Sequence, residues 1–391
     1  MAAALSSYGE TADDLEQGLR DCAARLGVFA EFFATPTAVF ASFGPSGMQQ
    51  TVLLRTREAR IDLQGLSTVH DVLEGVRGGR LTAEQGLAEL NLVMRAPPRF
   101  PWYMGVIGSG VGAASFDLLL GGTWREAGIA ATVGLGVGVL IALGRRFDRL
   151  ARLTELLAGL AASLLALAWG HLVRDMSPAT VALASLILLL PGLGITLGVA
   201  ELASRQLAAG SARLAGATVT LLSLSIGSFL GTTILRELGL MPHTHAPHVP
   251  TTPAMLAVAA TLATLALLVA TNSRVRDLWL VAVSVAIALV GARLGAALLG
   301  ATLGVTLASL VVGLWSNGFA RLTRRPAVLA LMPGLAVLVP GALGYQGISA
   351  FLRTATGGLE VLGAVLVIAA GLVVGLLVAD ATLAPRPNEP A

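Results

Sequence analysis

The feature that most constrains this chain is a series of apolar segments that begins after residue 101. A helix needs about 20 predominantly apolar residues to cross the hydrocarbon core of a bilayer. Hydrophobic residues make up 55% of the chain and charged residues only 13%, which excludes an ordinary soluble protein. The sequence therefore predicts an integral membrane protein, with ten spans at about 103–121, 128–144, 153–173, 180–201, 214–235, 254–271, 278–292, 294–315, 327–350 and 359–379.

The first 100 residues differ from the rest in charge and in periodicity. They contain nine Arg against twelve Asp and Glu, whereas the other 291 residues contain seventeen Arg against eleven acidic residues. Apolar residues at helical spacing follow Thr11 and Thr82, and Thr82 with Gln85 is expected to cap its helix. The segments TAVFASF and QTVLLRT have the pattern of a β-hairpin. These patterns predict a small α+β domain over 1–100. No nucleophile and base motif occurs in it, which favours a regulatory or stabilising role over catalysis.

Arginine placement predicts the orientation in the membrane, because short cytoplasmic loops carry an excess of positive charge. All 26 basic residues are Arg. With the N-terminus in the cytoplasm, the inner loops hold eleven arginines and the outer loops five, namely Arg125, Arg174, Arg236, Arg293 and Arg353. Both termini are therefore expected in the cytoplasm, with 382–391 as a tail. The arginines lie in short loops and form no patch, so the expected partner is the lipid bilayer and not a nucleic acid.

Proline and glycine interrupt two of the apolar segments. The PGLG of 191–194 recurs in LMPGLAVLVPG of 331–341, with Pro191 and Pro333 separated by 142 residues. The same shift carries the third span onto the eighth and the fifth onto the tenth, which divides the membrane part into 101–236 and 250–381. Because five is odd, the second copy must be inverted, as in many secondary transporters. The predicted fold is all-α in the membrane, with ten helices in two inverted five-helix repeats after a small cytoplasmic α+β domain.

Interrupted helices at matching places indicate a substrate site near the bilayer midplane, where freed backbone groups meet a small polar solute. The alternative is that the prolines and glycines produce kinks or close helix packing. The candidate residues at the interruptions are Pro191, Gly192, Gly194, Pro333, Gly334, Pro340 and Gly341.

Four hydroxyl side chains lie on one helical face of the fifth predicted span, at spacings of seven, three and four: Thr218, Ser225, Ser228 and Thr232. They are candidates for binding the solute. The alternative is that they donate to their own backbone or to a neighbouring helix. Tyr345 and Gln346, just after the second interruption, either bind the solute or anchor the helix at the interface.

Acidic residues inside membrane spans commonly mark proton pathways. Asp117, Glu201 and Glu360 are the candidates for proton coupling, and Asp117 comes first because it is the most internal. Its alternative role is that of a water-facing residue at the outer interface near Arg125. His243, His245 and His248 lie among three prolines, a composition typical of an extended loop, so neither a metal site nor a cofactor is predicted.

Four stretches resemble the threonine/serine exporter family: ATPTAVFASFG, LSTVHDVLEGVRGGRLT, PPRFPWYMGVIGSGVGAASFDLLLGG and LMPGLAVLVPGALGYQGI. The resemblance covers nearly the whole chain. It implies export of L-threonine and L-serine across the inner membrane, driven by the proton motive force. The PG motifs of the family correspond here to Pro191, Gly192, Pro333, Gly334, Pro340 and Gly341.

The expected function is thus a secondary transporter that exports threonine and serine by proton antiport with alternating access. Two other classes stay open, an intramembrane enzyme acting on lipid or peptide and a passive channel for small polar solutes. The spans contain no GxSxG, no HExxH and no paired aspartates suited to hydrolysis, which favours a transporter over an enzyme. A homo-oligomeric assembly is left open.

Overall fold

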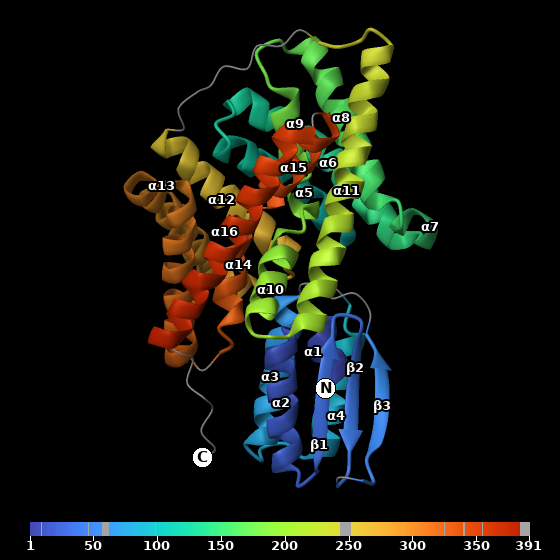
Figure 1. Cartoon of the computed structure of the whole chain (residues 1–391), viewed down its shortest axis with the longest axis vertical. Coiled ribbons are helices and arrows are strands. Elements are labelled where there is room, and N and C mark those ends of the chain that lie inside the picture. The colour runs from blue at the N-terminus through green and yellow to red at the C-terminus, as the bar shows by residue number, and fades with distance from the viewer. Residues whose placement is uncertain are drawn as a thin grey trace.

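The structure is a computed structural model that describes residues 1–8, 10–45, 47–56, 62–97, 99–242, 252–323, 325–338, 341–353 and 355–383. A helical bundle makes up most of it, with a small α+β region at one end (Figure 1). Among the described residues, eight helices are long and apolar enough to cross a membrane, or nine if one bent pair counts as a single span. These nine correspond to the second to tenth predicted spans. The chain is a multi-pass membrane protein.

The α+β region combines four helices with a three-stranded sheet: α1 (Ala2–Ser7), α2 (Ala12–Arg25), β1 (Ala30–Thr35), β2 (Ala38–Phe43), β3 (Gln50–Arg55), α3 (Leu63–Arg77) and α4 (Ala83–Arg95). The sheet is antiparallel in the order β1-β2-β3, and Phe40 of β2 pairs with Phe33 on one side and Leu53 on the other. The predicted hairpin, β2 with β3, is confirmed, whereas β1 was not predicted. Thr82 and Gln85 form the expected capping box at the start of α4.

The first predicted span is an 18-residue helix, α5 (Trp102–Leu119), which is not among the candidate spans. Its glycines, serines and Asp117 make it less apolar than the other membrane helices. It packs against α6 (Trp124–Arg146) and α12 (Pro253–Ala270). The approach to α6 is close, since a Cβ on Gly134 would lie only 2.7 Å from the carbonyl oxygen of Ser109. Small residues permit such helix contacts in membranes.

The remaining helices of the first membrane half surround this pair: α7 (Asp148–Ala151), α8 (Thr154–Leu172), α9 (Pro178–Ser185), α10 (Gly192–Ala203) and α11 (Leu207–Glu237). α9 and α10 are linked by a short 3-10 helix, η1 (Ile187–Leu189), and the pair bends by 46°. The break expected at Pro191 is therefore present.

The second membrane half continues with a short η2 (Val275–Asp277) and with α13 (Leu278–Thr323), α14 (Val328–Leu338), α15 (Gly341–Arg353) and α16 (Ala355–Thr382). α13 contains two spans that meet at Gly300, where φ is 81° and ψ is 167°. The prediction that this boundary lies at Arg293 was wrong. The reversal needs a left-handed backbone, which glycine adopts without strain and arginine does not. After the turn the two arms lie close together, because a Cβ on Gly295 would be 2.7 Å from the Cα of Gly304.

The α+β region shares an apolar core with the end of the membrane bundle below α10 and α11 (Figure 1). Buried Leu5 and Leu66 belong to the same cluster as Leu280 of α13 and Met332 of α14. Polar contacts join the two parts as well: the Leu63 amide donates to the carbonyl of Thr271 at 2.9 Å, Asn272 donates to Asp62 at 2.8 Å, and Arg274 donates to Thr68 at 3.0 Å. This end of the bundle is covered by the α+β region.

Candidate functional site

A cavity of about 850 Å³ lies between α8, α9, α11 and α15, and it is the candidate site. Its lining includes Pro178 at the start of α9 and Pro242 just after α11. These two helix ends are at the side of the bundle away from the α+β region (Figure 1). Eight lining side chains carry a hydroxyl or an amide group: Ser163, Thr180, Ser225, Ser228, Thr232, Tyr345, Gln346 and Ser349. None of the described lining residues is charged.

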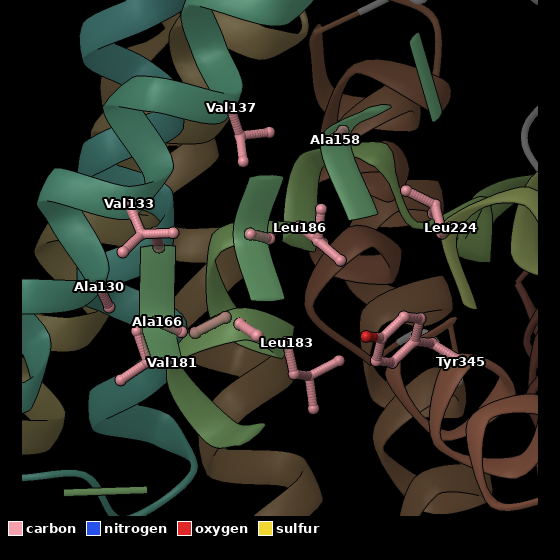
Figure 2. Close-up of a cluster of buried hydrophobic side chains, with 14 of the residues drawn as sticks. Ala130, Val133, Val137, Ala158, Ala166, Val181, Leu183, Leu186, Leu224 and Tyr345 are labelled. Carbon is pink, nitrogen blue, oxygen red and sulfur yellow. The ribbon is translucent and has the colours of Figure 1, made fainter. Parts of the chain in front are cut away.

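Five residues predicted from the sequence meet in this cavity. Ser225, Ser228 and Thr232 come from α11, and Tyr345 and Gln346 come from α15. The cavity therefore takes side chains from both membrane halves. Figure 2 shows the Tyr345 ring beside Leu183 of α9, and both belong to the largest buried apolar cluster.

The fourth predicted hydroxyl, Thr218, does not line the cavity. It is exposed on α11 and donates to the carbonyl of Leu214 in its own helix. Sequence reasoning missed Ser163, Thr180 and Ser349. Ser349 had a usable signal, because it follows Tyr345 by four residues and so shares its helical face.

α10, which follows Pro191, and α15 approach each other closely. Pro191 occupies the N-cap position of α10, with φ at −81° and ψ at 43°. A Cβ on Gly341, the first residue of α15, would lie 3.1 Å from the Cα of Gly192. Such a contact is tighter than most, so a larger residue here would require the neighbouring backbone to shift. Gly194 is less restricted, since its nearest neighbour would be the Cβ of Ala217 at 3.8 Å.

The second expected interruption is not present at Pro333. Pro333 is inside α14, and Gly334 follows it within the same helix. A Cβ on Gly334 would lie 2.6 Å from a methyl carbon of Val312, so this glycine permits close packing of α14 on α13. A buried proline whose helix is held by its neighbours removes one backbone donor without ending the helix. A single candidate span runs from Val328 to Leu352, and Pro340 within it lies outside the described residues.

The predicted acidic residues are not brought together. Asp117 is fully buried near the end of α5, and neither of its carboxylate oxygens has a hydrogen-bond partner among the described residues. It does not line the cavity, although Leu120, one turn further, does. Its carboxylate lies against Gly122. Glu360 is exposed on α16.

Glu201 is held in an ion pair. Its two carboxylate oxygens accept from the Arg213 guanidinium at 2.7 and 3.0 Å, and one also accepts from the backbone amide of Ala12 at 3.4 Å. Its side chain is only 3% exposed. Because Ala12 begins α2, this pair joins the first membrane half to the α+β region.

No group of three or more His, Cys, Asp or Glu suited to a metal ion occurs in the part of the chain that the structure describes. His243, His245 and His248 lie outside that part.

Comparison with known proteins identifies the family. The family model described as "Putative threonine/serine exporter" matches residues 1–235, which is more than half of the chain. This chain belongs to the threonine/serine exporter family. A second model of this family, "Threonine/Serine exporter, ThrE", matches residues 256–382. The resemblance noted in the sequence is confirmed over nearly the whole chain. The family is described as one of exporters, a class of transporter and not of enzyme.

Curated relatives of this exporter-family chain include several fungal membrane proteins. An uncharacterized protein of Schizosaccharomyces pombe is 27% identical over 368 residues, which cover 90% of this chain and 48% of the relative. The "Pheromone-regulated membrane protein 10" of Saccharomyces cerevisiae is 26% identical, covering 88% of this chain and 46% of the relative. The protein of the same name from Debaryomyces hansenii is 24% identical, covering 88% of this chain and 35% of the relative. The chain thus spans less than half the length of these relatives. No solved structure matches it.

Proposed function

We propose that this chain exports L-threonine and L-serine across the cell inner membrane by proton antiport, with alternating access between two inverted five-helix halves. The observation that carries the proposal is the cavity, which takes polar side chains from both halves beside the contact between Gly192 and Gly341. A solute held there touches elements that belong to each half. A movement of one half against the other would then change which side of the membrane the solute can reach.

The chemistry of the lining fits a zwitterionic amino acid. Eight hydroxyl and amide side chains can meet a carboxylate, an ammonium and a hydroxyl group, and the described lining offers no fixed charge. A solute with a net charge would lack a compensating partner in this cavity, which is costly at low dielectric. The site therefore favours a net-neutral amino acid over acidic or basic ones.

The α+β region fits a regulatory or stabilising domain over 1–100, on the cytoplasmic side with the C-terminal tail 382–391. It covers the end of the bundle opposite the start of α9 and the end of α11, which line the cavity (Figure 1). With this orientation, the solute site lies toward the outer side of the membrane. The membrane halves are then 101–236 and 250–381.

Asp117 is the strongest candidate for proton coupling. It is fully buried and its two carboxylate oxygens have no hydrogen-bond partner among the described residues. Glu201 is engaged by Arg213, and Glu360 is exposed. A buried ionisable group in a membrane bundle is expected to serve function, because it costs stability.

Uptake of labelled threonine into inverted vesicles tests the proposed function. A proton-coupled exporter gives saturable uptake that collapses with an uncoupler. A passive channel gives uptake that ignores the uncoupler, and an intramembrane enzyme gives no uptake. We expect Asp117→Asn to abolish proton-driven uptake at normal expression, and Glu360→Gln, the exposed control, to retain it. Normal uptake by Asp117→Asn would remove that residue from the mechanism.

A further inference from the structure

The hydroxyl groups around the cavity divide into two classes. Most of them donate to an oxygen of the protein. Ser228 donates to the carbonyl of Gly159 at 3.0 Å, and Thr232 donates to that of Phe229 at 2.8 Å. Ser163 donates to the carbonyl of Leu160 at 2.9 Å, and Thr180 lies 2.9 Å from the hydroxyl of Ser177. These groups have already used their single proton.

Ser225 and Ser349 form the second class. Both hydroxyl oxygens are buried and neither has a hydrogen-bond partner among the described residues. Ser225 is 0% exposed on α11, and Ser349 lies on α15, so one comes from each membrane half. Both line the cavity. Thr196 is also buried without a partner, but it does not line the cavity.

An unpaired buried hydroxyl costs stability, so native proteins keep few of them. Two such groups, one on α11 and one on α15, line the same cavity, which indicates that a ligand completes them. We infer that Ser225 and Ser349 are the side chains that hydrogen bond the transported solute, one from each half; this rests on the proposed function. Each hydroxyl can donate to a carboxylate or accept from an ammonium. The pair therefore suits the zwitterionic head group of a net-neutral amino acid.

This assignment divides the cavity-lining hydroxyls by role. Ser228 and Thr232 shape the cavity, whereas Ser225 and Ser349 determine affinity. Removing an unpaired buried hydroxyl relieves a cost in the free protein, so Ser225→Ala and Ser349→Ala should fold at least as well as wild type. If these hydroxyls had a purely structural role, the two alanine substitutions would instead lower the melting temperature of the protein.

The experiment measures the Kd for labelled L-threonine on purified full-length protein in detergent, together with its melting temperature without ligand. We expect Ser225→Ala and Ser349→Ala each to weaken binding by about tenfold or more, which is the effect of losing a hydrogen bond to a charged group. Two controls should stay within about twofold: Thr218→Val removes a paired hydroxyl of α11 outside the cavity, and Thr196→Val removes an unpaired hydroxyl outside the cavity.

Failure of this inference is distinguishable from failure of the proposed function. If wild type binds and transports threonine and both serine variants bind as tightly as wild type, the inference is overturned and the proposed function stands. If the control variants weaken binding as much as the serine variants, the inference is also overturned. If wild type neither binds nor transports threonine or serine, both are overturned.

Discussion

The two membrane halves are alike where two long helices pack face to face. In the first half, α11 meets α8 at Gly227 and Gly231; in the second, α16 meets the later arm of α13 at Gly371 and Gly375, each 144 residues further along. A Cβ on Gly231 would meet the hydroxyl of Ser163, and one on Gly375 would meet that of Ser309. Both serines donate to the carbonyl three residues earlier, at 2.9 Å in each case. The same small-residue contact thus occurs twice.

The halves differ at the segments around these two prolines. The first bends by 46° between α9 and the segment of η1 and α10 that contains Pro191, whereas in the second Pro333 stays inside α14. α15 then packs on α10 and α11 of the first half and completes the cavity there. The comparison teaches that the two pairs of long helices are alike, whereas the segments around Pro191 and Pro333 differ. The cavity lies where α15 of the second half packs against helices of the first half.

The ion pairs near the α+β region give the largest expected difference between the halves. Arg213 pairs with Glu201 in the first half, and Arg325 pairs with Asp277 in the second. We expect Arg213→Met to destabilise the protein by about 3 kcal/mol or more, because it leaves a buried carboxylate unpaired. Arg325→Met should cost less, since the Asp277 side chain is 10% exposed and that of Glu201 only 3%.

Thermal unfolding of the full chain in detergent measures both effects. Adding Glu201→Gln to Arg213→Met should recover much of the lost stability, because the unpaired charge is then gone. Equal losses for the two arginine variants would contradict the ranking of the two ion pairs.

Valine at the matched glycines tests the common framework. We expect Gly231→Val and Gly375→Val to destabilise by similar amounts, about 1–3 kcal/mol each, because the added side chain meets a serine hydroxyl and backbone atoms. The controls are Gly216→Ala in the first half and Gly363→Ala in the second, where an added Cβ would have open space. Melting temperatures check this. If only one of the two valine variants has a lower melting temperature than its alanine control, the two helix contacts are not equivalent.

The prolines test the difference between the halves. Pro191→Ala should restore a backbone donor at the bend, straighten the α9–α10 segment and weaken threonine binding several-fold, because α10 would shift against Gly341. Pro333→Ala should leave binding near that of wild type, because Pro333 already lies within a helix. The Kd for threonine, measured for both variants, tests this expected difference. Equal effects would mean that both prolines shape the site, as the sequence alone had suggested.

The sequence predicted what local chemistry determines. The capping box of Thr82 and Gln85 and the hydroxyl face of α11 follow from short spacings along the chain. It failed where the outcome depends on distant partners. The turn within α13 depends on the backbone conformation of Gly300. The sequence placed this turn at Arg293 instead, because a charged residue is typical of a loop between two spans. Glu201 could not be matched with Arg213 without knowing that α10 packs on α11.

The cavity shows the same limit. Ser225 and Tyr345 could be selected as candidates, but nothing in the sequence says that α11 and α15 face each other. Ser349 emerges only once that contact is known. Likewise, the distinction between paired and unpaired hydroxyls depends on carbonyls such as that of Gly159, which is 69 residues from Ser228.

The smallest expected effects are those of removing the serine hydroxyls at the two helix contacts. Ser163 and Ser309 occupy matched positions and make the same hydrogen bond, but only Ser163 lines the cavity. We expect Ser163→Ala and Ser309→Ala to change stability by the same small amount, within about 1 kcal/mol of wild type, because each removes one hydroxyl bonded within its own helix. Threonine affinity should be unchanged in both, since the Ser163 proton is already donated to Leu160. Weaker binding by Ser163→Ala alone would show that a paired hydroxyl still contacts the solute. α8 would then contribute both to the helix packing and to the solute site.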